Sequence, residues 1–296
     1  MKLLAAIDSS PFSQQVLDEI ARRPWPAETT VCILHVIDWA QLPSSASLSQ
    51  MLKQSASLLV ESAAKRLCKV GLHTTTKIME GHPRIAVPDY AKKCRADFVL
   101  VGSHGASGFV RFLLGSVAQA ALRRSPCSVE IVRGPAGDSA GGSSAMKILL
   151  ATDGSECSMA AVRSIAGRPW PAASQVRAIS VVPLIVPFGE TIPIGPVYYP
   201  HSDVIEKLQK EARGQFEEAV ARAHQILSEA QITVIETECL PLGDARAVIL
   251  DEAKAWGADL IVVGSHGYHG IDKLMLGSVS ESVAIHAHCS VEVIRE

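Results

Sequence analysis

Two copies of one glycine pattern stand near the ends of the two halves of this sequence. The first copy is Gly102-Ser-His-Gly105, followed after nine residues by Gly115-Ser116. The second copy is Gly264-Ser-His-Gly267, followed after nine residues by Gly277-Ser278. Each copy comes directly after a run of apolar residues, which is typical of a buried strand that ends in a loop.

This pattern has the chemistry of a phosphate-binding loop. Glycines at a strand end allow backbone φ angles above zero and bring N–H groups close to a ligand. A Gly-Ser pair that opens a helix adds a hydroxyl and free amides where the helix dipole favours negative charge. A single copy would be equally compatible with a tight turn, but duplication at fixed spacing favours phosphate binding in both halves.

The glycine pattern belongs to a longer internal repeat. Residues 2–8 match residues 147–153 at a shift of 145, and residues 96–105 match residues 258–267 at a shift of 162, so the second half carries 17 extra residues. We therefore expect two homologous domains of usual size joined by a Gly/Ser-rich linker. The expected boundaries are a first domain at 1–133, the linker at 134–145, and a second domain at 146–296 with a proline-rich insertion near 183–202.

Composition narrows the function classes. A chain of 296 residues with 48% hydrophobic residues can bury two cores, and its net charge of −2 favours neither nucleic acid nor an anionic membrane as a partner. No apolar stretch reaches transmembrane length, and Asp8 interrupts the apolar start that a signal peptide would need. The seven cysteines show no C-x-x-C spacing, so we expect reduced thiols, no zinc site and a cytoplasmic location.

Apolar runs alternate with helical patterns along each half. This alternation predicts an α/β fold in which helices cover both faces of a parallel sheet. Ligands of such sheets bind at the carboxyl ends of the strands. The strands of the first half are expected near residues 3–7, 30–36, 74–79, 98–101 and 128–132, and the second half repeats this order.

With an aspartate ending the first strand and Gly-x2-Gly-x9-Gly-Ser after the fourth, each half resembles the universal stress protein family, in its ATP-binding subgroup. The resemblance covers essentially the whole chain. It implies two tandem Rossmann-like (adenine nucleotide alpha hydrolase-like) domains, each with a five-stranded parallel sheet. It also implies an ATP-binding regulatory protein of the stress response with two nucleotide sites per chain; whether Mg2+ accompanies the ATP stays open.

The resemblance assigns nucleotide contacts to matching positions of the two halves. An aspartate would lie beside the adenosine, a valine would present backbone to the adenine, and glycines with a serine would hold ribose and phosphates, followed by a valine amide at the helix start. These residues are Asp8, Val36, Gly102, Gly105, Gly115, Ser116 and Val117, and then Asp153, Val181, Gly264, Gly267, Gly277, Ser278 and Val279.

Physical reasoning supports some of these roles and leaves others open. Phosphates would repel Asp8 and Asp153, so these residues suit the ribose hydroxyls or the adenine amino group. Helix N-capping is the alternative, which we rank lower because Ser9, Ser10 and Ser155 already offer caps. Arg111 and Lys273 could pair with phosphate oxygens or lie in solvent, and the histidine of each Gly-Ser-His-Gly run could donate to a phosphate or pack over the loop.

No catalytic residue and no metal ligand set is assigned. The sequence lacks the G-x-x-x-x-G-K-[ST] run that would supply a phosphate-binding lysine and a magnesium-binding hydroxyl. We therefore expect nucleotide binding with little or slow hydrolysis, and control of an unknown regulatory protein partner. The alternatives are a slow ATPase or phosphotransferase, and a chaperone-like interaction module that binds no nucleotide.

Other conspicuous residues are assigned structural roles. His286-Ala-His288-Cys289 is expected to be a helix exit, because positions i and i+2 do not share a helix face. Trp25 and Trp170, each between two prolines, are expected to close the core after the first helix of each half. Pro88 is expected to bend its helix.

The final strand of each half, near 128–133 and 290–295, is expected at a sheet edge, where exposed backbone invites pairing. In the family this strand commonly mediates dimerisation, so the resemblance implies an internal pseudo-dimer or a homodimer. The insertion near 183–202 contains five prolines and is interpreted as an interface or a lid, with a tolerated loop as the alternative.

Overall fold

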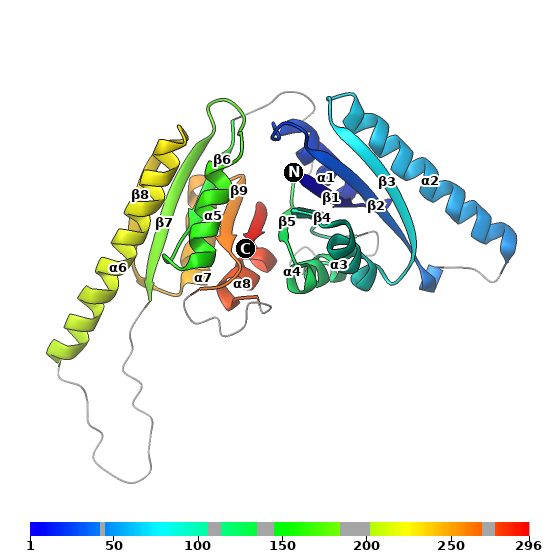
Figure 1. Cartoon of the computed structure of the whole chain (residues 1–296). Helices are drawn as coiled ribbons and strands as arrows, with labels where there is room; N and C mark the ends of the chain where they lie inside the picture. Colours follow the sequence, from blue (N-terminus) through cyan, green and yellow to red (C-terminus); the bar gives the residue numbers. More distant parts are fainter. Residues whose placement is uncertain (42–44, 106–113, 135–144, 184–201, 268–275, 296) are drawn as a thin grey trace, which may run out of the picture.

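The computed structural model describes residues 1–41, 45–105, 114–134, 145–183, 202–267 and 276–295. Strands and helices alternate in both halves, as Figure 1 shows. The first half contains β1 (Lys2–Ala6), α1 (Pro11–Arg22), β2 (Thr30–Asp38), the 3-10 turn Trp39–Gln41, α2 (Ala46–Cys68), β3 (His73–Gly81), α3 (Pro83–Cys94), β4 (Phe98–Gly102), α4 (Ser116–Arg124) and β5 (Ser128–Val132). The second half contains β6 (Lys147–Ala151), α5 (Glu156–Ala166), β7 (Gln175–Pro183), α6 (Ser202–Glu229), β8 (Thr233–Gly243), α7 (Ala245–Trp256), β9 (Leu260–Gly264), α8 (Ser278–His286) and β10 (Ser290–Ile294).

All ten strands belong to one sheet. Its order is β3-β2-β1-β4-β5-β10-β9-β6-β7-β8, so both halves have the same strand order on either side of the centre. Pairing is parallel within each half and antiparallel only between β5 and β10. The prediction of a parallel α/β sheet in each half is therefore confirmed, and the two final strands pair with one another.

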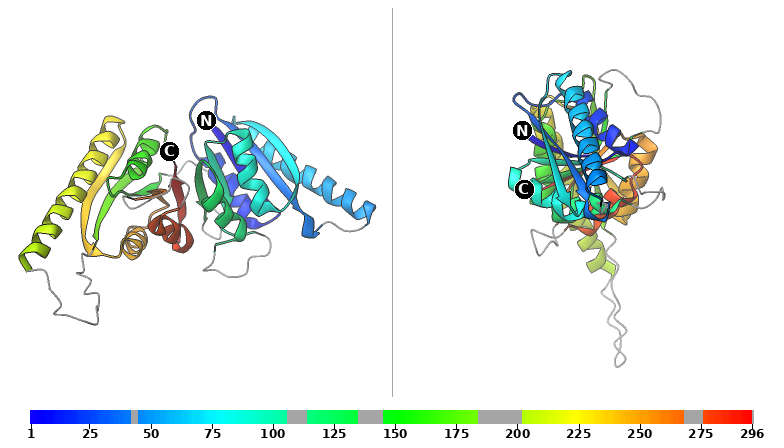
Figure 2. Two further views of the ribbon diagram at one scale, coloured as in Figure 1. Left: turned by 60° about the horizontal axis from the view of Figure 1, so that its bottom comes forward. Right: turned by 90° about the vertical axis from the view of Figure 1, so that its right-hand side faces the viewer.

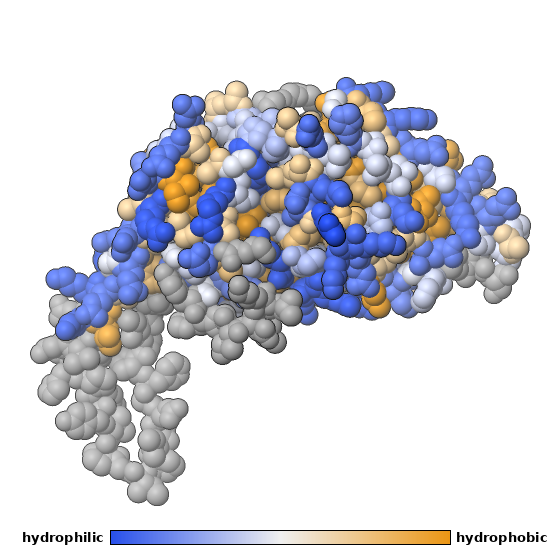
Figure 3. Space-filling view, viewed as in Figure 1, coloured by the Kyte–Doolittle hydropathy of each residue, from blue (hydrophilic) through white to orange (hydrophobic). Residues whose placement is uncertain are grey.

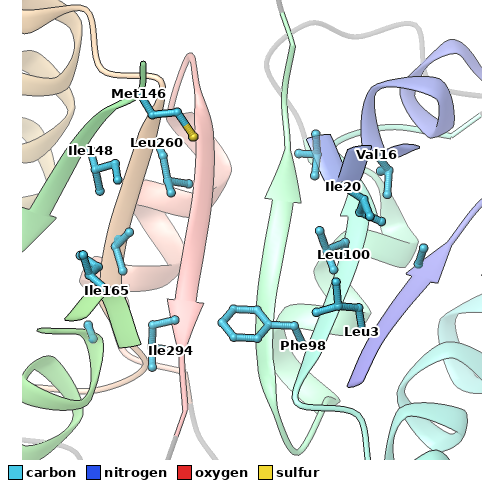
Figure 4. Close-up of a cluster of buried hydrophobic side chains, with 14 of the residues drawn as sticks. Leu3, Val16, Ile20, Phe98, Leu100, Met146, Ile148, Ile165, Leu260 and Ile294 are labelled. Carbon is cyan, nitrogen blue, oxygen red and sulfur yellow. The ribbon is translucent and has the colours of Figure 1, made fainter. Parts of the chain in front are cut away.

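Helices cover both faces of this sheet, as the two views in Figure 2 also show. Alternate side chains of a strand point to opposite faces, so Leu3 and Ala5 join one hydrophobic cluster while Leu4 joins the other. The first cluster lies under α1, α2, α5 and α6, and the second under α3, α4, α7 and α8. Each cluster contains residues of both halves, and in Figure 4 the Phe98 ring of the first half points toward the second half.

A buried ionic network lies at the boundary, where Glu130 of β5 stands directly opposite Glu292 of β10. Arg23, which follows α1, donates to Glu130 Oε1 at 2.7 Å and to Glu292 Oε1 at 2.8 Å. Arg168, which follows α5, donates to Glu292 Oε2 at 2.5 Å. Glu19 of α1 also accepts from Arg23. Three carboxyl groups and two guanidinium groups are thus nearly excluded from water at the centre of the sheet.

Trp25 and Trp170, which follow Arg23 and Arg168 closely in the sequence, pack against this network. The Trp170 ring lies 5.6 Å from the Arg23 guanidinium carbon and 4.9 Å from that of Arg168, and the Trp25 ring lies 5.9 Å from that of Arg23. Both tryptophans pack against the first hydrophobic cluster. The expected loop that closes the core is present, and it also lines the boundary between the halves.

Other expectations have mixed outcomes. Helix α8 ends at His286, so the predicted helix exit is confirmed, and Pro88 lies inside α3. No described helix is both long enough and apolar enough to cross a membrane. Most of the linker (135–144) and most of the proline-rich insertion (184–201) lie outside the described residues.

Candidate functional site

Asp8 lies directly after β1 and is held by the turn that leads into α1. Its Oδ1 atom accepts from the Ser10 amide at 2.9 Å, from the Ser13 hydroxyl at 2.7 Å, and from the Ser10 hydroxyl. The Asp8 amide in turn donates to Ser13 Oγ at 2.7 Å. The N-cap residue of α1 is Ser10 and that of α5 is Ser155. The aspartates are therefore not the helix caps, in line with the ranking of capping below ligand contact.

The second aspartate oxygen faces the glycine loop in both halves. A methyl group added at Gly105 would lie 2.9 Å from Asp8 Oδ2, and one added at Gly267 would lie 2.5 Å from Asp153 Oδ2. The second glycine of each pattern therefore comes within van der Waals reach of the strand-end carboxylate. A larger residue at either position would displace that carboxylate.

One backbone hydrogen bond closes the glycine loop in each half. The Gly115 amide donates to the Ser103 carbonyl at 2.7 Å, and the Gly277 amide donates to the Ser265 carbonyl at 2.8 Å. A methyl group at Gly115 would lie 3.1 Å from the same Ser103 oxygen. This hydrogen bond joins the two ends of the loop. It therefore holds the start of the last helix of each half beside the end of the fourth strand of that half.

The reason for glycine at these positions differs from the sequence-based interpretation. The described glycines with positive φ are Gly71, Gly81, Gly154 and Gly257, and none of them belongs to the repeated pattern. Glycine is needed in the pattern for close approach instead. A methyl group at Gly102 would lie 2.7 Å from Phe12 Cβ, and one at Gly264 would lie 2.6 Å from backbone atoms at the start of α5. This pair therefore serves strand–helix packing, and its contact with a nucleotide stays a prediction.

The last helix of each half begins without a side-chain cap. Gly115 is the N-cap of α4 and Gly277 is the N-cap of α8. Glycine has no side chain to accept from the first-turn amides, and among the described residues no acceptor is found for the amides of Ser116, Val117, Ser278 and Val279. Ser116 and Ser278 are both exposed. Such a helix start favours an anion through its amides and its dipole.

Val36 and Val181 lie where their strands extend beyond the neighbouring first strand. The Ile7 amide donates to the Leu34 carbonyl, and the Thr152 amide donates to the Ile179 carbonyl at 3.0 Å. Backbone groups two residues apart along a strand point the same way, so the backbone of each valine faces the space past the end of that first strand. This direction agrees with the adenine contact, which stays a prediction.

The two histidines within the glycine pattern pack differently. His104 lies 5.1 Å from the Phe12 ring, between centroids. His266 is buried, and its Nδ1 lies 2.9 Å from Ser265 Oγ and 3.9 Å from Cys157 Sγ. Both side chains therefore pack against the start of the helix that follows the aspartate. Of the two roles left open, packing over the loop is the one that the structure shows.

Other charged and nucleophilic groups supply no further site residue within the described part of the chain. Arg111 and Lys273 lie outside the described residues. Within the described ranges no group of three or more His, Cys, Asp or Glu side chains could hold a metal ion. Cys127 and Cys289 directly precede β5 and β10, at the strand ends opposite the glycine loops, and burial raises the pKa of both thiols to about 12.

Sequence reasoning missed the residues that hold the aspartates. Ser10 and Ser13 position Asp8, while in the second half Ser155 donates its amide to Asp153 at 3.0 Å and Ser158 bonds to the Gly154 amide. The internal repeat could have indicated them, because Ser10 and Ser13 match Ser155 and Ser158 at the same shift of 145 that relates the two aspartates.

Comparisons with known proteins find universal stress proteins as relatives of both halves of the chain. The model of the "Universal stress protein family" matches residues 1–133 and 145–295. A universal stress protein of Mycolicibacterium smegmatis is 29% identical over 307 residues, spanning 99% of this chain and 96% of the relative. A shorter match, 46% identical over 79 residues, joins 27% of this chain to 53% of universal stress protein A homolog 2 of Coxiella burnetii.

Two solved structures share the fold over nearly the full length. A universal stress protein from Archaeoglobus fulgidus has a TM-score of 0.67 at 20% identity, covering 100% of this chain and 96% of that one. A putative universal stress protein from Pseudomonas aeruginosa has a TM-score of 0.61 at 16% identity, covering 99% and 92%.

Proposed function

We propose, because this chain belongs to the universal stress protein family, that it is an ATP-binding regulatory protein with one nucleotide site in each of its two tandem domains. One observation carries the proposal. In both halves a backbone bond from Gly115 to Ser103, or from Gly277 to Ser265, sets an uncapped helix start beside a strand-end aspartate. A nucleotide needs both groups at once, since its phosphates suit the helix start and its ribose hydroxyls suit a carboxylate.

Little or slow hydrolysis is part of the proposal. The sequence lacks the lysine and the magnesium-binding hydroxyl of a P-loop, and Asp8 Oδ1 accepts three hydrogen bonds within its own turn. An ion such as Mg2+ would be held mainly by phosphate oxygens and water, because the described residues offer no ligand cluster. We also propose that the protein is cytoplasmic, forms a homodimer and acts on a regulatory protein partner.

The first experiment identifies what the protein carries. Denatured, purified protein releases its small molecules, which chromatography and mass spectrometry identify and count per chain. We expect adenine nucleotide, up to two per chain, with ATP prominent. If none is released, titration calorimetry with ATP, ADP, AMP and cyclic AMP follows, and failure of all four to bind would refute the proposal.

Two matched glycine variants test the sites one at a time. Gly105→Ala and Gly267→Ala each place a methyl group against an aspartate oxygen, at 2.9 Å and 2.5 Å. Each should weaken one site by roughly tenfold or more, which corresponds to about 1.4 kcal/mol, and leave the other unchanged. Calorimetric stoichiometry separates these results, and the double variant should lose both sites. Unchanged affinity in both single variants would contradict the assignment of the loops.

A further inference from the structure

An open hollow lies between α3 and α4 in the first half. It shares only Ser116 with the proposed nucleotide site. His82, Arg84 and Ile85 line it from the start of α3, and Ser116, Gln119, Ala120, Arg123 and Arg124 line it from α4. Three guanidinium groups and no carboxylate belong to this lining. In Figure 3 the surface over α3 and α4 is mostly hydrophilic.

Two of these arginines carry unbalanced charge. Arg84 and Arg124 are exposed and form no ion pair within the described part of the chain. Arg123 is partly neutralised, because it pairs with Glu281 of α8 at 2.6 Å. His82 Nδ1 lies 3.6 Å from Asp38 Oδ1, and Asp38 does not line the hollow. The hollow therefore keeps a net positive charge that no described residue of the chain neutralises.

The matching surface of the second half has the opposite character. The repeat puts Arg246 in place of Arg84, but Arg246 lies 3.9 Å from Asp244, which replaces His82. Ile285 replaces Arg123, and Glu281 replaces Gln119. One fold thus carries a cationic hollow in the first half and a neutral to acidic surface in the second, so the α3–α4 scaffold by itself does not require the arginines.

We propose that this hollow binds an acidic segment of a partner protein. Arginine clusters recognise carboxylates through paired N–H donors. The hollow follows α4, whose nine residues span about 13 Å, a length that about four extended residues would cover. Ile85 is 45% exposed in the lining and Ala120 lies beside it, so an apolar side chain of the segment would also find a contact. This apolar contact favours a peptide over an inorganic anion.

The test uses the full chain and a fluorescently labelled eight-residue peptide of aspartate, glutamate and a central leucine. We expect fluorescence anisotropy to show binding at low salt, and loss of binding at about 1 M salt, where the screening length is about 3 Å. Arg84→Glu with Arg124→Glu should weaken binding by about tenfold or more. Arg246→Glu, at the matching position of the second half, should leave it unchanged.

Each other outcome contradicts the proposal. Equal loss in Arg246→Glu would mean non-specific attraction to any arginine, and equal binding of a peptide with amides in place of its carboxylates would exclude charge recognition. If Ile85→Ser leaves peptide affinity unchanged while tripolyphosphate displaces the peptide, the hollow is a site for inorganic anions and not for a protein segment. Thermal unfolding of every variant checks that its fold is intact. No nucleotide enters this test, so its failure leaves the proposed nucleotide sites untouched.

Discussion

Asp8 and Asp153 occupy matching positions but are held by different hydrogen bonds. Asp8 Oδ1 accepts from two donors of Ser10 and from the Ser13 hydroxyl. Asp153 Oδ1 accepts from the Ser155 amide, while the hydroxyl of Ser158 turns to Thr152 and to the Gly154 amide instead. The first aspartate is therefore part of the structure of its turn, whereas the second is less tied to its own.

Replacing each aspartate by alanine separates its two roles. Asp8→Ala leaves several donors without an acceptor, so it should lower the free energy of unfolding by about 1–3 kcal/mol. Asp153→Ala should cost less, because one amide loses its partner. Each variant should weaken nucleotide binding in its own half. Urea denaturation measures stability and calorimetry measures affinity; equal stability loss with unchanged affinity would mean that both aspartates serve only their turns.

Among the elements, β5 and β10 bring two buried glutamates together. Glu130 and Glu292 face each other. Glu19 of α1, which has Ser164 at the matching position of α5, is a third carboxyl group and pairs with Arg23 and, at 2.6 Å, with the partly exposed Arg22. Burial raises the pKa of Glu130 to about 8, opposed by Arg23 and assisted by Glu292 and Glu19. Burial would also raise the pKa of Glu292, but Arg168 and Arg23 outweigh it and hold that pKa below its usual 4.5. Glu130 therefore keeps its proton to a higher pH than Glu292 does.

This proton makes stability depend on pH. Between the usual pKa of 4.5 and about 8, folded Glu130 binds a proton that the unfolded chain has released. Its contribution is therefore fully present below pH 4.5 and is lost as the pH rises toward 8. Glutamine imitates the protonated acid, so Glu130→Gln should flatten the decline in unfolding free energy over this range. Denaturation at several pH values checks this, and an unchanged slope would mean that Glu130 is ionised in the fold.

At the scale of the whole molecule, the halves are joined by continuous backbone pairing and by exchanged side chains. Arg133 donates to the Ala284 carbonyl of α8 at 2.6 Å, and Arg295 donates to the Leu122 carbonyl of α4 at 2.7 Å. These contacts, like the central glutamates, repeat across the boundary with near twofold symmetry. Because both hydrophobic clusters also cross the boundary, we expect the halves to unfold together.

Loss of one central arginine should therefore destabilise the entire chain. Arg168→Met removes the main partner of buried Glu292 and should cost about 3–5 kcal/mol. The matched control is Arg66→Met, which breaks the exposed pair with Asp18 and should cost less than about 1 kcal/mol. Urea denaturation followed by tryptophan fluorescence should show one transition, shifted strongly only in the first variant. Two separate transitions, or equal small shifts, would contradict a boundary that couples the halves.

The sequence by itself determined the local and the repeated features of this protein. Apolar runs and their alternation with helices predicted the parallel sheet of each half, because periodicity reports which side chains are buried. The identical spacing of the two glycine patterns located the strand-to-helix loops, and the resemblance identified the family. These inferences needed only neighbouring residues and comparison of the two halves.

Tertiary structure decided which distant residues meet, because pairing across a sheet is not encoded by spacing along the chain. The repeated Arg-Pro-Trp-Pro-Ala and Cys-Ser-Val-Glu segments were visible, but only the antiparallel register of β5 and β10 placed Glu130 opposite Glu292 with Arg23 between them. The backbone likewise showed that the pattern glycines are required by close packing and not by positive φ. A contact across more than a hundred residues depends on the whole fold, so the sequence pattern alone could not supply it.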